Sequence, residues 1–198
     1  MGAINKAIAL VRNPVGFMTS DKDAPETVRS IMINYVAVLA AIPFFATLIG
    51  DLWYYSFLGG SYAGIFIGFA FARAVLTYIL DVVAVYIIGI VIQMLAGNFG
   101  TAKDQVKSLK LSAYVFTPAF LISVLNILPF LGILTILGVI YGLYILYMGL
   151  PIVLGTAKEK VIPYVVAVVV VTLIVYVVIA VIIAAVTAAI FLTTFGLY

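Results

Sequence analysis

The sequence contains no cysteine and no histidine, and it has few charged residues of either sign. Without cysteine the chain forms no disulfide and offers no thiolate nucleophile. Without histidine it lacks the commonest metal ligand and the side chain that most readily acts as a base near neutral pH. Because nucleophilic triads and zinc sites draw on these two residue types, the sequence predicts no enzyme activity, no metal site and no cofactor.

Apolar residues dominate what is present. They make up 67% of the 198 residues, and charged residues make up 9%, whereas a soluble domain has roughly 45–50% and about 25%. The composition predicts an integral membrane protein with one domain over residues 1–198, because no stretch is polar enough for a separate soluble domain. The expected partner is the lipid bilayer, and nucleic acid is not expected because basic residues are few.

Five apolar stretches approach or exceed the roughly 20 residues that a helix needs to cross the hydrocarbon core. Helix-start signals separate them from the polar segments, such as Asp23 followed by Pro25 and Glu26 ahead of the first stretch. We therefore predict an all-α fold, a polytopic membrane bundle of five transmembrane helices. The expected spans are residues 31–49, 66–96, 111–128, 129–154 and 163–192.

Lysine and arginine occur in alternate loops. They precede the first span and lie between the second and third and between the fourth and fifth, while the other loops and the C-terminal tail have none. The positive-inside rule then predicts a multi-pass protein of the cell membrane with the N-terminus in the cytoplasm and the C-terminus outside. The same rule predicts that residues 1–30 form a cytoplasmic segment. Within this segment Ile4, Ile8 and Val11 recur at helical spacing. This pattern indicates a short amphipathic helix on the membrane surface, the alternative being a frayed tail.

Three lysines begin the helix of the third span. Lys103, Lys107 and Lys110 are spaced by four and three residues and so lie on one helical face beside the membrane. Each would contribute about 1 kcal/mol of binding to anionic lipid. The alternative interpretation is a plain solvated basic face.

Small residues recur every four positions in two of the spans and at the start of a third. Such ridges allow helices to approach closely, so they favour packing of the chain with itself or with other membrane proteins, although a compact monomer uses the same contacts. The ridges are Gly60, Gly64 and Gly68; Gly138 and Gly142; and Ala180, Ala184 and Ala188.

Arg73 and Asp81 are the two charges inside the apolar stretches. A charge at the centre of the hydrocarbon costs about 2.5–3.5 kcal/mol on insertion scales, so each side chain needs a partner, a water-filled space or a role. Eight residues along a helix correspond to a rise of about 12 Å and a turn of about 80°, so the two side chains are not expected to meet.

Two interpretations of these charges remain open. In one, Asp81 and Arg73 line the path of a small-solute or ion transporter or channel. In the other they are structural. Arg73 then reaches the membrane boundary or meets Asp51, and Asp81 bonds a hydroxyl or amide of Tyr114, Tyr144 or Asn126.

Tyr114, Pro118, Tyr141 and Tyr144 belong to short strings that resemble those of the Yip family, the Ypt/Rab-interacting membrane proteins. Tyr114 and Pro118 stand where the family shows a Gly-Tyr pair followed by proline, and Tyr141 and Tyr144 belong to a matching string in the fourth span. The other matching residues are Asn13, Pro14, Phe17, Gly149 and Leu150.

The resemblance implies a five-span unit with a cytoplasmic N-terminus and a role in membrane organisation or trafficking-like processes. Ala113 replaces the glycine of the Gly-Tyr pair. The long N-terminal region of the eukaryotic members, which the family uses to bind small GTPases, is missing, so that binding is not expected here. The chain looks like a minimal prokaryotic member, a structural or interaction protein.

Overall fold

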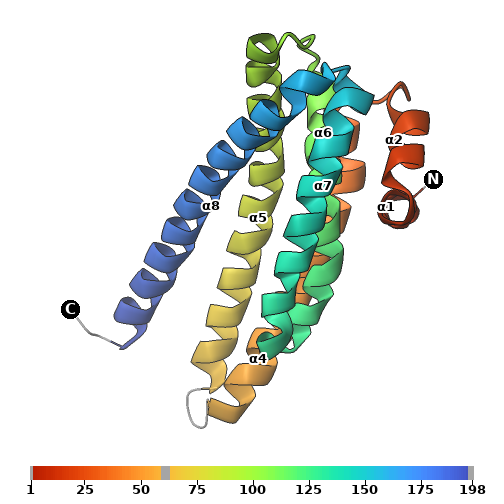
Figure 1. The fold of residues 1–198 in the computed structure, drawn as a ribbon. Coiled ribbons are helices and arrows are strands. Elements are labelled where there is room, and N and C mark those ends of the chain that lie inside the picture. The colour runs from red at the N-terminus through yellow and green to blue at the C-terminus, as the bar shows by residue number, and fades with distance from the viewer. Residues whose placement is uncertain (1, 59–62, 196–198) are drawn as a thin grey trace.

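The computed structural model describes residues 2–58 and 63–195, and every regular element within those ranges is a helix. Five helical segments in these ranges are long and apolar enough to cross a membrane. This confirms the predicted all-α membrane bundle (Figure 1).

The helical elements follow one another with short connections. In chain order they are α1 (Ala3–Arg12), α2 (Pro14–Asp21), α3 (Val28–Ile31), the π-helix η1 (Met32–Val36), α4 (Ala37–Leu58), α5 (Ala63–Ala96), the 3₁₀ helix η3 (Gly97–Phe99), α6 (Gln105–Ile122), the 3₁₀ helices η4 (Ser123–Ile127) and η5 (Pro129–Leu134), α7 (Thr135–Leu154) and α8 (Lys158–Phe195). The crossing segments are Val28–Ser56, Phe66–Phe99, Gln105–Ile127, Phe130–Leu154 and Lys158–Ile190.

Local sequence explains where several helices begin and end. Asn13 separates α1 from α2, and Pro14 is the first residue of α2. The side-chain Oδ1 of Asn13 accepts a hydrogen bond of 3.0 Å from the backbone N–H of Gly16. Gly155 ends α7 with a backbone φ of 69°, a conformation that residues other than glycine rarely adopt. The N-terminal segment is thus two short helices rather than a frayed tail.

Helix α6 forms the centre of the bundle. Within its most apolar window 67% of the residues are buried inside the protein, whereas the figure for α8 is 6%. α6 packs against α4, α5 and α7 and also against the N-terminal α1 and α3. Its sequence suits this place because Ser112 and Thr117, both fully buried, bond to backbone carbonyls of Val85 and Ala113.

Glycines of α7 allow it to lie against α6. A Cβ added at Gly138 would stand 2.8 Å from the Cα of Ala119, and one at Gly142 would collide with the carbonyl oxygen of Val115. The backbones therefore touch where the Gly138 and Gly142 ridge faces α6, and this ridge is occupied inside the single chain.

Helix α8 is attached mainly near its first turns. Tyr164 is fully buried there, its hydroxyl donates to the carbonyl of Ile92 in α5, and its ring stacks on Phe99 with centroids 4.6 Å apart. From this point α8 runs away from the other helices, as the blue helix in Figure 1 shows.

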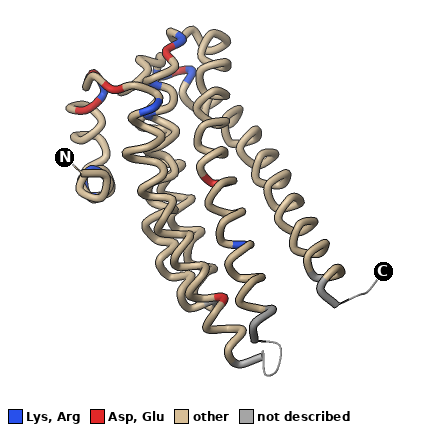
Figure 2. The backbone as a smooth tube through the Cα atoms, turned by 180° about the vertical axis from the view of Figure 1, so that it is seen from behind, with Lys and Arg blue, Asp and Glu red and all other residues tan. Residues whose placement is uncertain are grey.

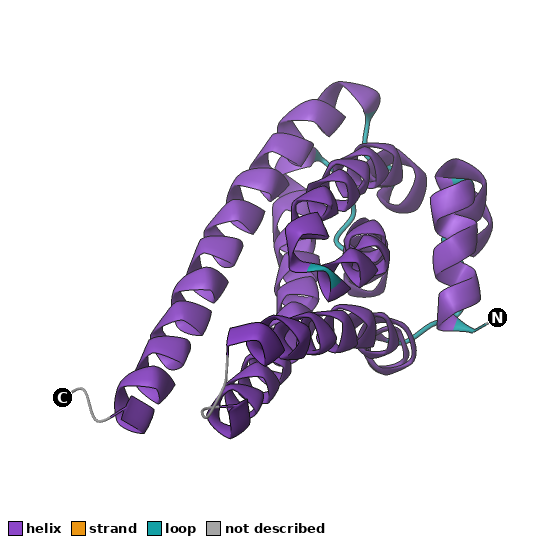
Figure 3. Cartoon of the chain, turned by 90° about the horizontal axis from the view of Figure 1, so that it is seen from below, coloured by secondary structure: helices purple, strands orange, loops and turns teal. Residues whose placement is uncertain are grey.

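Charged residues are concentrated at the end of the bundle where α6 begins and α7 ends, here called the basic end (Figure 2). The opposite end, at η4 and η5, is called the far end. Viewed along the bundle, α1 and α2 lie to one side, and α1 runs across the bundle axis rather than along it (Figures 1 and 3).

Membrane sidedness stays a prediction from the loops. A reporter that works only in the cytoplasm is expected to be silent when it is fused after Tyr198 and active when it is inserted in the loop at residues 101–104, because five crossings place these points on opposite sides. Cytoplasmic activity of the C-terminal fusion would contradict a five-span topology.

Candidate functional site

A buried ionic network lies at the basic end and joins three parts of the chain. The Nζ atom of Lys110 stands 3.4 Å from Oδ2 of Asp21 and 3.3 Å from Oε2 of Glu26. The same ammonium donates to the backbone carbonyl of Asp21 at 2.8 Å. Lys6 of α1 pairs with Glu26 at 2.6 Å and with Asp21 at 3.3 Å, and Tyr114 of α6 donates to the Asp21 carboxylate. The network therefore fixes α1 and α2 to α6.

Full pairing is what makes this burial tolerable. The Lys110 side chain is 1% exposed, and an ammonium taken out of water is costly unless carboxylates and carbonyls replace its hydration. Burial by itself would raise the pKa of Asp21, but the Tyr114 hydrogen bond and the charges of Lys110 and Lys6 hold the pKa of that carboxyl below its ordinary value. The contribution of Asp21 to docking is thus complete above about pH 4 and is lost as the pH falls through the lowered pKa.

Aromatic contacts extend the network into the bundle. The Tyr114 ring packs edge-on against Phe17 of α2 and Tyr35 of η1, with centroids 5.5 and 6.0 Å apart. Tyr35 shares a hydrogen bond of 2.8 Å with Thr117, and Tyr141 of α7 donates to the carbonyl of Val11 at 2.8 Å. Tyr114 and Tyr141, two of the residues that carry the family resemblance, therefore hold the N-terminal helices in place.

The other two residues of the resemblance lie elsewhere. Pro118 is buried in α6, and its carbonyl faces Gly138. Tyr144 is 44% exposed on α7, with its ring beside that of Tyr141. They do not contribute to the ionic network.

The three predicted lipid-binding lysines have different surroundings. Lys110 belongs to the buried network, Lys107 pairs with Asp23 at 2.9 Å, and Lys103 is exposed. The anionic-lipid prediction therefore depends on Lys103 and Lys107.

Helix α1 has two apolar faces. Ala7 and Leu10 are fully buried against the protein, while Ile4 and Ile8 are 50% and 39% exposed. The exposed face belongs to a helix that lies across the bundle axis (Figure 3). This placement supports the prediction of a membrane-surface helix.

Arg73 meets Asp51, as one of the two interpretations predicted. Its Nη1 donates to both carboxylate oxygens of Asp51, at 2.8 and 2.9 Å, and so joins α5 to α4. The contact lies near η4, because Gly50 of α4 touches the backbone carbonyl of Asn126.

The predicted partners of Asp81 are wrong. Within the described part of the chain Asp81 makes no hydrogen bond or ion pair, and Tyr114 bonds to Asp21 instead, because the register of α6 turns it toward the N-terminal helices. The group with which Asp81 interacts electrostatically is Tyr176 of α8. Arg73 and Asp81 do not form a common site.

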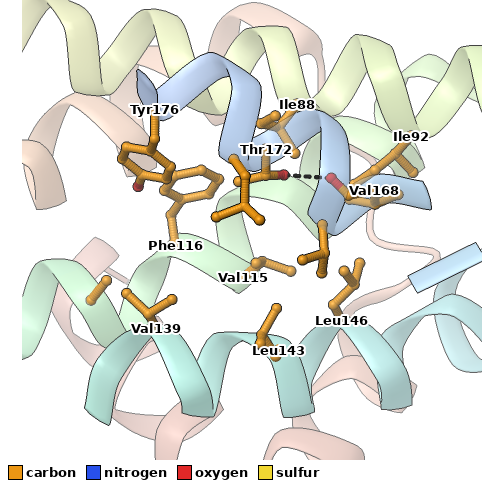
Figure 4. Close-up of a pocket in the computed structure, with 13 residues that line it drawn as sticks. Ile88, Ile92, Val115, Phe116, Val139, Leu143, Leu146, Val168, Thr172 and Tyr176 are labelled. Atoms are coloured by element: carbon orange, nitrogen blue, oxygen red, sulfur yellow. Dashed lines mark hydrogen bonds between the residues drawn. The ribbon is translucent and has the colours of Figure 1, made fainter. Parts of the chain in front are cut away.

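Two hollows border α8. The first, of about 140 Å³, lies between α5, α6, α7 and α8, and aliphatic side chains such as Val115, Leu143 and Leu146 line it (Figure 4). The hydroxyl of Thr172, which also lines the cavity, donates a hydrogen bond of 2.8 Å to the backbone carbonyl of Val168. The cavity thus offers almost no polar recognition.

The second hollow is an open groove of about 840 Å³ between α8 and the ends of α4 and α5. The ridge of Ala180, Ala184 and Ala188 lines one wall, and Phe66 and Arg73 belong to the other. All three alanines are exposed. Among the described residues, no helix therefore packs closely against the predicted ridge on α8.

The remaining predicted ridge is only partly described. Gly68 faces open space, with nothing within 4 Å of an added Cβ. Gly60 lies outside the described residues, and Gly64 lies in α5 but its surroundings are not described.

Lys110→Met is expected to destabilise the protein by about 3 kcal/mol, because it leaves two partly buried carboxylates with one ammonium between them. The measurement is unfolding of the detergent-solubilised protein, together with protease cleavage of the N-terminal segment, which should increase. Lys103→Met is the matched control, since Lys103 is exposed. Equal stability of the two variants would contradict a supporting role for the network.

The sequence was finally compared with known proteins. None of the curated proteins and none of the solved structures matches the chain. The profile described as the Yip1 domain matches residues 8–182. The match begins within α1 and ends within α8, so it includes the docked N-terminal helices as well as the spans. The chain is therefore a multi-pass membrane protein that belongs to the Yip1 domain family.

Proposed function

We propose that this protein is a structural and interaction protein of the cell membrane, without enzyme activity, and that it associates with a second copy of itself through α8. One observation carries the proposal: the ridge of Ala180, Ala184 and Ala188 is exposed in an open groove. The ridge of Gly138 and Gly142 is already filled by α6, whereas the α8 ridge is open to a partner.

Small residues matter in lipid because apolar side chains gain little by leaving hydrocarbon. Association of spans instead relies on close packing of backbones, which alanine and glycine permit. The same ridge on two copies makes an isologous contact, in which each α8 packs on the other around a two-fold axis. In the most apolar window of α8, 6% of the residues are buried inside the protein. Most of the surface of this helix is therefore available for such a contact.

The basic end supports a role in membrane organisation. The exposed residues Ile4 and Ile8 give α1 a face that suits the membrane–water boundary. The ionic network holds this helix rigidly to the bundle, so its insertion would occupy area in one leaflet beside the spans. Lys103 and Lys107 lie at the same end, where they would attract anionic lipid.

Transport is the second function that the intramembrane charges suggest. Asp81 is absent from the residues that line the apolar cavity and from those that line the groove, whereas Arg73 lies in the groove and pairs with Asp51. Neither of these two hollows is therefore lined by both charges.

Asp81→Asn is accordingly expected to leave proton and ion flux into protein-containing liposomes unchanged, because the carboxylate lines neither hollow beside α8. The measurement is fluorescence of a trapped pH indicator under an imposed gradient, with protein-free liposomes as the control. A flux that the native protein supports and the variant loses would replace the interaction role by transport.

Crosslinking tests the association directly, because the chain has no cysteine of its own. Ala184→Cys is expected to give a crosslinked dimer in native membranes with a short bifunctional maleimide. Ile140→Cys, on an exposed face of α7, is the matched control and should stay monomeric. Adding Ala180→Leu to the Ala184→Cys variant should reduce the dimer, since the larger side chain separates the helices.

Two outcomes would contradict self-association. One is equal crosslinking at residues 140 and 184, which would indicate random collision in the membrane. The other is a crosslinked product that contains a different protein and no second copy, which would make the α8 ridge a site for another partner.

A further inference from the structure

A polar pocket of about 340 Å³ lies at the far end, apart from the basic network. Its lining residues are Thr47, Asp51, Tyr54, Tyr55, Arg73 and Asn126, and they come from α4, α5 and η4. Gly50 lets α4 touch the carbonyl of Asn126, and the ion pair of Arg73 with Asp51 joins α4 to α5. Three elements thus meet to build one pocket.

The length of α5 supports a place for the pocket near the depth of lipid headgroups, toward one end of the crossing segments. The helix from Arg73 to Gln93, the first polar residue from the basic end of α5, is about 30 Å long, which matches the hydrocarbon core. Asn126 belongs to η4, at the turn between the third and fourth spans. Trp53, Tyr54 and Tyr55 follow Asp51 after Leu52, and such aromatic residues typically occupy the membrane–water boundary.

The charges in the pocket leave specific bonding capacity. A guanidinium carries five N–H donors, and Arg73 uses only Nη1 toward Asp51 within the described chain. The Arg73 side chain is 43% exposed, so its other donors can reach a ligand. The pair is neutral as a whole, and its carboxylate would repel a purely anionic group. A ligand with both an anion and a cation fits it better.

We propose that this pocket binds the headgroup of an amine-bearing zwitterionic phospholipid of the far leaflet. The lipid phosphate accepts from the free N–H groups of Arg73. The lipid ammonium lies against the Asp51 carboxylate and the rings of Tyr54 and Tyr55, which attract cations through their faces. Arg73 and Tyr55 also line the groove beside the α8 ridge, but the pocket uses no residue of the ridge itself, and a single copy of the chain is sufficient to form it.

The test is native mass spectrometry of the purified protein with equal amounts of phosphatidylethanolamine and phosphatidylglycerol, scored on the monomer peak. The native protein should retain mainly the ethanolamine lipid. Arg73→Gln should lower its retention about tenfold, the loss of one charge-assisted contact. Asp51→Asn should shift the preference toward the glycerol lipid, because the repulsive carboxylate is gone. Arg29→Gln, an exposed arginine at the basic end, is the matched control and should bind like the native protein.

Tyr54→Leu keeps the test independent of folding, because it leaves the ion pair intact and Tyr54 is 49% exposed. It should weaken retention of the ethanolamine lipid and leave the glycerol lipid unchanged. Equal retention of the two lipids by the native protein, or unchanged retention in all three variants, would overturn the proposal. Displacement of the lipid by soluble glycerophosphoethanolamine would overturn the assignment to a bilayer lipid, since the free headgroup would then suffice.

Discussion

The close contact of α6 with α7 is the constraint on which the rest of the structure depends. The backbones touch only because Gly138 and Gly142 lack side chains at the contact. With α7 this close, α6 becomes the central helix, and its buried Ser112 and Thr117 hydroxyls bond backbone carbonyls inside the protein because hydrocarbon offers no acceptor. The central place of α6 then puts Lys110 and Tyr114 beneath the N-terminal helices, where Asp21 and Glu26 neutralise the buried ammonium.

The sequence was sufficient for the architecture because the signals for membrane helices are local. Long apolar stretches, helix-start residues and alternating basic loops predicted the five spans. The contact of Arg73 with Asp51 was one of the two interpretations of the charges inside the spans. The partners of Tyr114 and Lys110 could not be predicted, since they lie about 90 positions away and periodicity does not tell which neighbour a helix face meets. The burial of Lys110 is the clearest case, because spacing alone placed it on a lipid-facing stripe. The course of α8 was also beyond prediction, because a helix that is apolar on every side has no preferred face.

The two ends of the bundle are stabilised by different physics. At the basic end, charges are numerous and compensate one another inside the protein, so the N-terminal segment is part of the folded unit. At the far end a single ion pair joins α4 to α5, and its remaining hydrogen-bonding capacity faces outward. The first end suits a rigid platform on one membrane surface, and the second suits exchange with the surrounding lipid. Membership of the Yip1 domain family gives the chain a common architecture without assigning it a partner.

The attachment of α8 near Tyr164 has a mechanical consequence. The helix is held where Tyr164 bonds Ile92 and stacks on Phe99, and it continues to Phe195, about 45 Å beyond that point. Over such an arm, a rotation of about 10° at the attachment would displace the other end by about 8 Å, which is close to the distance between the axes of two packed helices. A small change in the packing of one tyrosine ring would therefore alter the width of the groove beside the far half of α8.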